Sequence, residues 1–302
     1  MSAVVAVEAL LDAAPRWPTR IVCLTEETTE ILYRIGCGDR VVGVSGYTCR
    51  PPEARQKPRV SSFLDAKFDR ILELRPDLVL GFSDLQADIG RELARRGVPV
   101  YLFNQRSIAE VLQTVRVVAA LVGEAARGEA LALTLERNVR ETAARAATLP
   151  RKPRVFFEEW PDPLISAIRW VSELVEVAGG VDVCAESRAR HDAAGRIFTP
   201  EGVAARAPEV IIASWCGKKA SYARIAGRTA FSEVPAVLHD RLYEVKSTFI
   251  LQPGPAALTD GLAQLERIIA EVAHETRDTT VKPRTLRAFR PPVWADASEA
   301  DV

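Results

Sequence analysis

The sequence predicts an α/β protein with two Rossmann-like lobes, each built on a parallel sheet, joined by one long interdomain helix. Three observations lead to this prediction. Short apolar segments bounded by turn residues alternate with helical patterns, which is typical of parallel α/β sheets. The alternation stops at about residue 107 and returns only after Pro150. A helix–proline–strand unit also occurs twice, once on each side of this interruption.

The first lobe is predicted over residues 19–106, after an N-terminal tail of residues 1–18. Strands are expected at residues 20–24, 41–44, 59–61, 78–82 and 98–103. The last two are continuous apolar runs of the kind that helices cover on both faces of a sheet. A helix is expected after the first strand, where Thr25, Thr28 or Thr29 could cap it, and another over residues 85–96.

Residues 107–150 are predicted to form the connecting helix, because they are rich in Ala, Leu, Glu and Arg. Gly123 is the place where this helix could be broken once. The second lobe is predicted over residues 151–275, with strands at 155–157, 210–214 and 242–245 and helices from Ser166 and over 255–274. Residues 276–302, with their prolines and arginines, are expected to be a tail.

Composition excludes several classes of function. The chain has 302 residues and 48% hydrophobic content, enough to bury a large core in two domains. Its 40 basic and 40 acidic side chains cancel, so no nucleic acid or anionic membrane surface is indicated as a partner. Apolar runs are shorter than the ~20 residues that span a bilayer, so no membrane insertion is expected. The first residues lack the charged start of a signal peptide, which predicts a cytoplasmic protein as written, or a periplasmic one if the true start lies upstream.

Cysteine and histidine usage gives no metal or catalytic motif. The five cysteines form no C-x-x-C pair and are odd in number, which favours reduced thiols over a disulfide framework. With three histidines far apart in sequence, a zinc site is disfavoured and no metal site is predicted. Nucleophile-elbow, Walker and dinucleotide-binding glycine motifs are lacking, so the protein is not expected to be an enzyme.

The internal repeat joins DRILELRPDLVL, which begins at Asp69, to EGVAARAPEVII, which begins at Glu201, 132 residues later. Each copy reads as a short helix with an acidic residue in its first turn, where the helix dipole favours it. A proline then ends the helix and a strand follows. Two similar lobes are therefore indicated. Simple helix-end electrostatics remains the alternative explanation for Asp69 and Glu201.

Four features together resemble the vitamin B12-binding proteins. They are the strand Arg20–Leu24 with its threonine-rich sequel, Gly43-Val44-Ser45-Gly46-Tyr47 followed by Pro51-Pro52, the unit ending in Pro76-Asp77-Leu78-Val79, and the second copy of that unit. More broadly, residues 19–274 are similar to the ABC-importer binding proteins for B12, haem and iron–siderophore complexes. The chain departs from this pattern near Gly195 and Arg196, which lack the aromatic side chain that B12-binding relatives place there.

The resemblance implies a monomeric, rigid receptor that holds a bulky metal chelate in the cleft between its lobes, in the first place a cobalamin-like corrinoid. It also implies an ABC permease as partner, with Asp69 and Glu201 docking on permease arginines. Haem or an iron–siderophore complex is the alternative ligand. A cytoplasmic enzyme or metal chaperone that uses Cys216 with Glu158 or Glu159 on a corrinoid or metal complex is a different class of function. A structural or sensory module without a ligand is a third.

Candidate ligand-binding residues follow the expected strands, because ligands of open α/β sheets bind at the carboxyl ends of strands. Large aromatic side chains suit the flat face of a macrocycle, and Cys216 close to Lys218 would be a good soft-metal ligand. The alternative is that the tryptophans are core anchors and the charged side chains are solvated. The candidates are Tyr47, Cys49, Phe63, Glu158, Glu159, Trp160, Arg169, Trp170, Trp215, Cys216, Lys218, Phe249 and Gln252.

Overall fold

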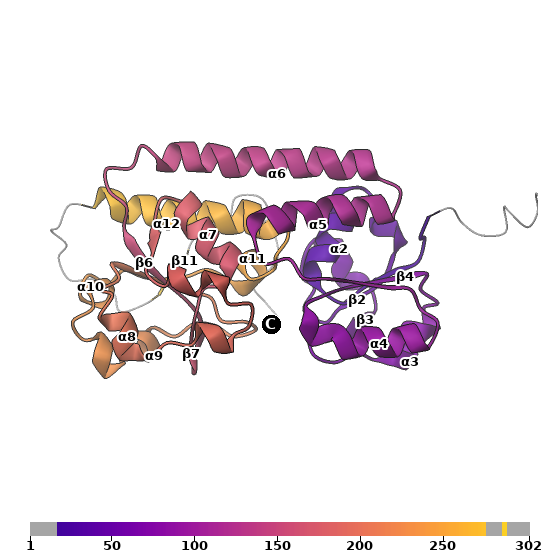
Figure 1. Cartoon of the computed structure of the whole chain (residues 1–302), viewed down its shortest axis with the longest axis horizontal. Coiled ribbons are helices and arrows are strands. Elements are labelled where there is room, and N and C mark those ends of the chain that lie inside the picture. The colour runs from indigo at the N-terminus through magenta and orange to yellow at the C-terminus, as the bar shows by residue number, and fades with distance from the viewer. Residues whose placement is uncertain (1–16, 276–285, 289–302) are drawn as a thin grey trace, which may run out of the picture. The chain divides into compact units, whose positions relative to one another are not determined.

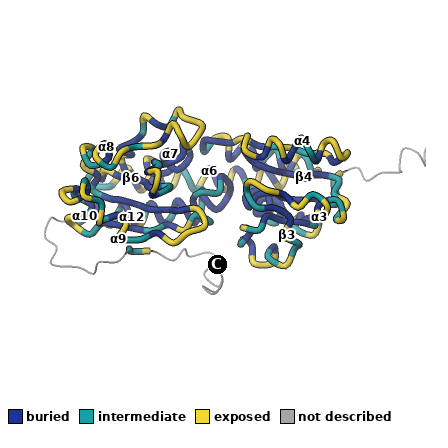
Figure 2. Tube along the Cα trace, turned by 90° about the horizontal axis from the view of Figure 1, so that it is seen from below, coloured by how far each residue is buried: buried dark blue, intermediate teal, exposed yellow. Residues whose placement is uncertain are grey.

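The computed structural model describes residues 17–275 and 286–288, and these divide into two units (Figure 1). The first unit comprises the described residues up to Gln105 together with Gln113–Ala132, and the second comprises Arg106–Leu112 and the described residues from Leu133 onwards. The expected tails 1–18 and 276–302 fall almost entirely outside the described residues. The inner strands β1, β4, β6 and β9 are mostly buried, and exposed residues gather on loops and outer helix faces (Figure 2).

The first unit is built on a five-stranded sheet of order β3-β2-β1-β4-β5, and every pair of neighbours is parallel. The strand order reverses between β1 and β4, since β2 and β3 continue to one side and β5 lies on the other. All five strands lie where the sequence predicts them: β1 (Ile21–Cys23), β2 (Val41–Ser45), β3 (Arg59–Ser61), β4 (Leu78–Phe82) and β5 (Val100–Phe103).

Short helices follow these strands. Thr25 is the N-cap residue of the first helix, but its hydroxyl donates to the Glu27 carboxylate and does not cap a backbone amide. The apolar faces of these helices cover Val22, Leu24 and Val79 in the core of the unit. The helices are α2 (Glu26–Arg34), η1 (Gly38–Arg40), η2 (Pro52–Gln56), α3 (Phe68–Glu73), η3 (Asp84–Gln86) and α4 (Ala87–Arg95).

The segment predicted as one connecting helix contains two helices, α5 (Ile108–Leu121) and α6 (Ala125–Ala146). The break falls at Gly123, whose φ of +78° is favourable only for glycine. The two helices pack closely in the first unit: a Cβ on Gly128 would lie 2.2 Å from the Cβ of Ala119. Arg116 also makes two hydrogen bonds to Glu129, at 2.7 and 3.1 Å.

The second unit has a sheet of order β11-β10-β9-β6-β7, in which β7 alone is antiparallel, and β8 pairs with β6. The sequence predicted β6, β9 and β10 and missed the other three. The strands are β6 (Arg154–Pro161), β7 (Leu164–Ser166), β8 (Val181–Asp182), β9 (Val210–Ala213), β10 (Leu242–Glu244) and β11 (Arg287–Ala288). β11 lies within the segment that was expected to be a tail.

β6 is longer than predicted. The sequence placed its end at Phe157, but Glu158 pairs with Ser166 and Trp160 with Ile165 in an antiparallel hairpin with β7. Glu158, Glu159 and Trp160 therefore lie within a strand and not in a loop. This pairing prolongs β6 because β7 supplies backbone partners that a single strand lacks.

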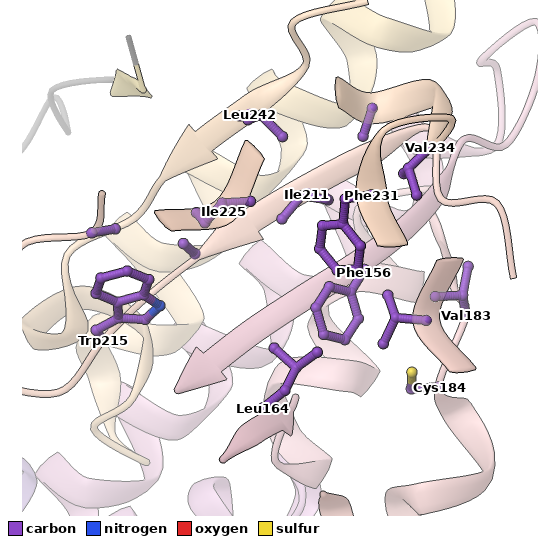
Figure 3. Packing of buried hydrophobic residues seen from close by; sticks show 14 residues of the cluster. Phe156, Leu164, Val183, Cys184, Ile211, Trp215, Ile225, Phe231, Val234 and Leu242 are labelled. Atoms are coloured by element: carbon purple, nitrogen blue, oxygen red, sulfur yellow. The ribbon is translucent and has the colours of Figure 1, made fainter. Parts of the chain in front are cut away.

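Helices and apolar side chains cover this second sheet. Figure 3 shows Phe156, Ile211 and Phe231 packed together, with Trp215 at the margin of the same cluster. The helices are α7 (Arg169–Val177), η4 (Ala185–Ala189), η5 (Ala194–Arg196), α8 (Pro200–Ala204), α9 (Tyr222–Ala226), η6 (Thr229–Phe231), α10 (Pro235–Leu238), α11 (Ser247–Ile250), the π-helical turn η7 (Ala257–Gly261) and α12 (Leu262–His274).

The internal repeat extends to backbone geometry. Arg75 and Ala207, 132 residues apart, have φ of +47° and +43°, and each directly precedes the proline that ends its helix. An arginine at the start of the central strand then binds the open end of that helix. Arg20 donates to the Leu74 carbonyl oxygen at 2.6 and 2.9 Å.

The same arrangement is present in the second unit. Arg154 donates to the Arg206 carbonyl oxygen through Nε, at 3.1 Å, and through Nη2. The acid after each proline closes the motif: Asp77 accepts the backbone N–H of Arg20 at 2.9 Å, and Glu209 accepts that of Arg154 at 3.0 Å. The two units are thus built on one repeated pattern.

Candidate functional site

The carboxyl ends of β6, β9 and β10 lie at one edge of the second sheet, because these strands are parallel neighbours. Trp160 lies near the end of β6 and is half-buried, and its indole N–H donates to the Asp162 carbonyl oxygen at 3.0 Å. Lys218 follows β9, and its Nζ lies 4.7 Å from the centre of the Trp160 ring. The structure therefore brings these two predicted residues together as a cation–π pair.

Glu158 was predicted to contact the ligand, but its side chain does not face outward. It is fully buried, accepts two hydrogen bonds from Arg228 at 2.6 and 2.9 Å, and accepts a third from the Trp215 indole N–H at 3.2 Å. Burial raises the pKa of Glu158, and the charge and hydrogen bonds of Arg228 oppose that shift. Glu158 thus fixes the start of the segment that carries Cys216 and Lys218, and direct ligand contact by Glu158 or Trp215 has no support.

Glu159 is likewise held by an arginine. It accepts hydrogen bonds from Arg196 at 2.6 and 2.9 Å and from the backbone N–H of Ile168 at 3.0 Å. Arg196 is buried and also donates to the Ser166 carbonyl oxygen at 2.6 Å. Arg196, which stands where B12-binding relatives place an aromatic side chain, therefore holds the β6–β7 hairpin in place.

Trp170 is a core anchor, in agreement with the alternative left open by the sequence. It is buried in α7, and its indole N–H donates to the Ile250 carbonyl oxygen at 2.9 Å. This bond holds the segment after β10, where Phe249 and Gln252 are half-buried. Arg169, which was also predicted to bind the ligand, pairs with Glu173 in the next helical turn, at 2.8 Å.

In the first unit, Tyr47, Cys49 and Phe63 follow β2 and β3, whose carboxyl ends are adjacent. The Tyr47 side chain is 52% exposed, while Cys49 and Phe63 are half-buried. The ring of Phe63 lies 6.4 Å from that of Phe82 at the end of β4. These three candidates lie at the strand-end edge of their own sheet, as the sequence predicts.

Sequence reasoning missed Glu26 and Glu27, which open α2 directly after β1. They are 8% and 1% exposed, and burial raises the pKa of Glu26 to about 7 and that of Glu27 to about 8. The rule that selected Glu158 and Glu159 would have found them too, because they also follow a central strand. Arg196 and Arg228 carried no such signal, since their partners lie 37 and 70 residues away.

The thiols differ in accessibility. Cys23 and Cys184 are buried, and burial raises the pKa of each to about 12, so neither is a reactive thiolate near neutral pH. Cys37 is also buried, whereas Cys216 is exposed. Within residues 17–275 and 286–288, no cluster of three or more His, Cys, Asp and Glu side chains is arranged to hold a metal ion. Among these same residues, no helix is both long and apolar enough to cross a membrane.

Asp69 and Glu201 occupy the first turns of α3 and α8, as the repeat predicts. The Asp69 side chain is 97% exposed and lies 3.5 Å from Arg96. Glu201 is also exposed, and Thr199 caps its helix by accepting the Gly202 N–H at 3.0 Å. Each acid is thus available at the surface of its own unit.

Two α/β units with aromatic and charged side chains at their strand ends define a two-lobed binding protein. The chain belongs to the periplasmic binding protein family, whose model matches residues 21–248. This membership confirms the resemblance and the α/β two-lobe fold predicted from the sequence. The family is one of substrate-binding proteins.

Relatives and solved structures agree with this membership. An uncharacterized ABC transporter substrate-binding lipoprotein of Bacillus subtilis is 27% identical over 83% of this chain and 80% of its own length. The vitamin B12-binding protein of Vibrio parahaemolyticus is 26% identical over 79% of this chain and 85% of its own.

Among solved structures, the periplasmic heme-binding protein RhuT of Roseiflexus sp. RS-1 has a TM-score of 0.74 at 25% identity, covering 84% of this chain and 99% of that one. The periplasmic vitamin B12-binding protein BtuF of Vibrio cholerae has a TM-score of 0.69 at 23% identity, covering 85% and 99%. The latter likeness is one of fold.

Proposed function

We propose that this protein is the substrate-binding component of an ABC importer and that its ligand is a cobalamin-like corrinoid. The observation that supports this most directly is the half-buried Trp160 with Lys218 over its ring, at a strand end held by two buried or half-buried ion pairs. A flat indole fixed in this way can stack on a macrocycle without losing much side-chain freedom. Relatives named as vitamin B12-binding proteins add to the case.

The proposed contact residues are the candidates that keep some exposure, apart from Glu159 and Arg169, which form ion pairs with Arg196 and Glu173. They are Tyr47, Cys49, Phe63, Trp160, Cys216, Lys218, Phe249 and Gln252. The buried candidates have a supporting role. Glu158 and Trp215 hold the segment after β9, and Trp170 holds the segment after β10. The position of the ligand between the lobes, expected from the resemblance, stays a prediction.

Haem is the second candidate ligand, and one observation favours it. Cys216 and Lys218 are both exposed on the segment after β9, where a thiolate could bind iron and an ammonium group could pair with a propionate. A solved structure of this fold is named as a periplasmic heme-binding protein. An iron–siderophore complex, usually anionic, would use the same ammonium group.

Calorimetric titration with cobalamin, cobinamide, haem and a ferric siderophore tests the proposal. We expect a corrinoid to bind at one site per chain and to be recovered chemically unchanged. Binding of haem or the siderophore alone would move the assignment to an iron-complex receptor. Alteration of a bound corrinoid would instead favour the enzyme or chaperone that uses Cys216.

The partner and the compartment are separate proposals. We propose that Asp69 and Glu201 steer docking on arginines of an ABC permease and that the protein acts as a monomer. Their exposure in the first turns of matching helices supports the docking role. A cytoplasmic location is proposed for the chain as printed and a periplasmic one for a longer product with an export signal. Only the periplasmic location is compatible with docking on an importer permease, which receives its cargo from outside.

A further inference from the structure

Each unit has two consecutive glutamates on or just after its first strand, Glu26 and Glu27 after β1 and Glu158 and Glu159 within β6, and the two pairs differ in their partners. In the second unit, Glu158 and Glu159 each form a two-hydrogen-bond ion pair with an arginine. In the first unit, Glu26 and Glu27 follow β1, and no described basic side chain pairs with either. The Thr25 hydroxyl donates to Glu27 Oε1 at 2.6 Å, whereas Glu27 Oε2 is buried without a hydrogen-bond partner.

An unpaired buried carboxylate is costly, and native proteins seldom keep one without a reason. Arg34 and Arg50 pair with Glu30, at 2.9 and 3.5 Å, and not with Glu26 or Glu27. The Cys23 thiol next to the pair stays neutral, since burial raises its pKa to about 12. Burial is also the main reason that the pKa values of Glu26 and Glu27 are raised, and the Glu26 charge raises the pKa of Glu27 further.

The position of the pair points to a ligand. β1 and β4 are the neighbours between which the strand order reverses, and ligands of open α/β sheets bind outside the carboxyl ends of strands at such a point. The end of β3, which leads to Phe63, is tied to this place because the Ser61 hydroxyl donates to the Leu24 carbonyl oxygen at 3.3 Å. No described cluster of three metal-ligating side chains is present, which favours an organic N–H donor over a metal ion.

We propose that Glu26 and Glu27 form an acceptor site for N–H groups at the ligand periphery, which selects an amide-edged macrocycle over a carboxylate-edged one. This inference rests on the proposed function, a receptor for a macrocyclic metal chelate. Glu26, the more exposed of the two, accepts the N–H of the ligand. Glu27 is a positioning residue: the Thr25 hydroxyl holds its carboxyl, which adds negative potential at Glu26 when it ionises, around and above its pKa of about 8. Primary amides of a corrinoid donate to the carboxyl oxygens of this pair, whereas the propionates of haem are repelled by the pair where it is ionised, above about pH 7.

The test compares dicyanocobinamide and haem as ligands of the full chain and of the Glu26→Gln, Glu27→Gln and double variants. Loss of the charged acceptor should weaken cobinamide binding and relieve the repulsion of haem. We expect the ratio of the two dissociation constants to shift toward haem by about tenfold in the double variant, the equivalent of one charged hydrogen bond. The control is Glu73→Gln, an exposed glutamate at the end of α3, which should leave the ratio unchanged.

Raising the pH gives a second readout. It ionises the pair in the wild type, so haem should be disfavoured further between pH 6 and 9, and this trend should be weaker in the double variant. An unchanged ratio in a folded double variant, with cobinamide still bound by the wild type, would overturn this inference and leave the proposed function intact. Failure of the wild type itself to bind either macrocycle would overturn both.

Discussion

Arg228 donates two hydrogen bonds, at 2.6 and 2.9 Å, to the carboxylate of Glu158, which lies 70 residues earlier in the chain. Neither side chain is accessible enough for water to replace the other partner. Removing one of them leaves an uncompensated buried charge, and this cost exceeds what the intact pair contributes. The same carboxylate accepts the Trp215 indole N–H, so the pair also fixes the segment that follows β9.

Replacement of Arg228 by alanine should therefore lower the free energy of unfolding by about 3 to 5 kcal/mol. Urea denaturation followed by circular dichroism measures the change. Arg140→Ala is the control, because Arg140 pairs with Glu136 on the exposed face of α6 and should cost at most about 1 kcal/mol. Equal losses of unfolding free energy in the two variants would show that the buried pair contributes no more to stability than the exposed one.

Trp160 and Trp170 should separate binding from stability. Trp160→Ala should weaken corrinoid binding by tenfold or more, since truncated aromatic anchors cost about 2 kcal/mol or more of binding energy. Because its side chain is only half-buried against the core, Trp160→Ala should lower stability less than Trp170→Ala does. Trp170→Ala should instead lower the free energy of unfolding by about 3 to 5 kcal/mol, because that ring is buried. Titration calorimetry measures binding and thermal melts measure stability. A larger loss of binding in Trp170→Ala, or a larger loss of stability in Trp160→Ala, would contradict the prediction.

Glu27 predicts how stability depends on pH. Its pKa is raised from 4.5 to about 8 on folding, so below pH 4.5 the side chain is protonated in both states and has no effect. As the pH rises from 4.5 to about 8, the unfolded state loses the proton first and the folded state becomes less stable. Glu27→Gln should remove this loss, so the variant should gain stability relative to the wild type between pH 5 and 9. Urea denaturation at three pH values measures the gain; a gain that is constant with pH would contradict the assignment.

Asp69 and Glu201 test the docking proposal. The double reversal Asp69→Lys and Glu201→Lys should leave folding and corrinoid affinity nearly unchanged, since both side chains are exposed. Binding to permease in proteoliposomes should fall, most strongly at low salt, where screening is weak. Exposed pairs of this kind contribute about 1 kcal/mol or less each. Unfolding of the variant or loss of ligand binding would assign the two acids to stability or to the ligand.

The compartment is tested by fractionating cells that express the native gene with its upstream sequence. The chain as printed is expected in the cytoplasmic fraction, and a product with an additional N-terminal export signal in the periplasm. Recovery of the printed chain in the periplasm would contradict the cytoplasmic expectation.

The sequence by itself determined the sheet of the first unit and the repeat. The strands Leu78–Phe82 and Val210–Ala213 are continuous apolar runs, and Pro76 and Pro208 end the helices before them. These signals are local, because a buried strand must be apolar and a proline cannot continue a helix. Gly123 marked the break between α5 and α6 in the same way, since its positive φ is a property of one residue.

Strand pairing needed the tertiary structure. Leu164–Ser166 follows a proline-rich segment that reads as a plain break, and Arg287–Ala288 lies in a segment that reads as a tail. Both are strands because another strand offers them backbone partners, β6 in the first case and β10 in the second. A short edge strand has little apolar pattern of its own, so its sequence carries almost no signal.

The same distinction between local signals and tertiary contacts applies to the site residues. The sequence placed Trp160, Glu158 and Glu159 at a strand end, which follows from where apolar runs stop. It could not distinguish Glu158, neutralised by Arg228, from Glu27, which has no such partner. Both read as a glutamate after a strand. Only the folded chain decides which carboxylate meets an arginine from 70 residues away, because burial and ion pairing depend on contacts between segments that are distant in sequence.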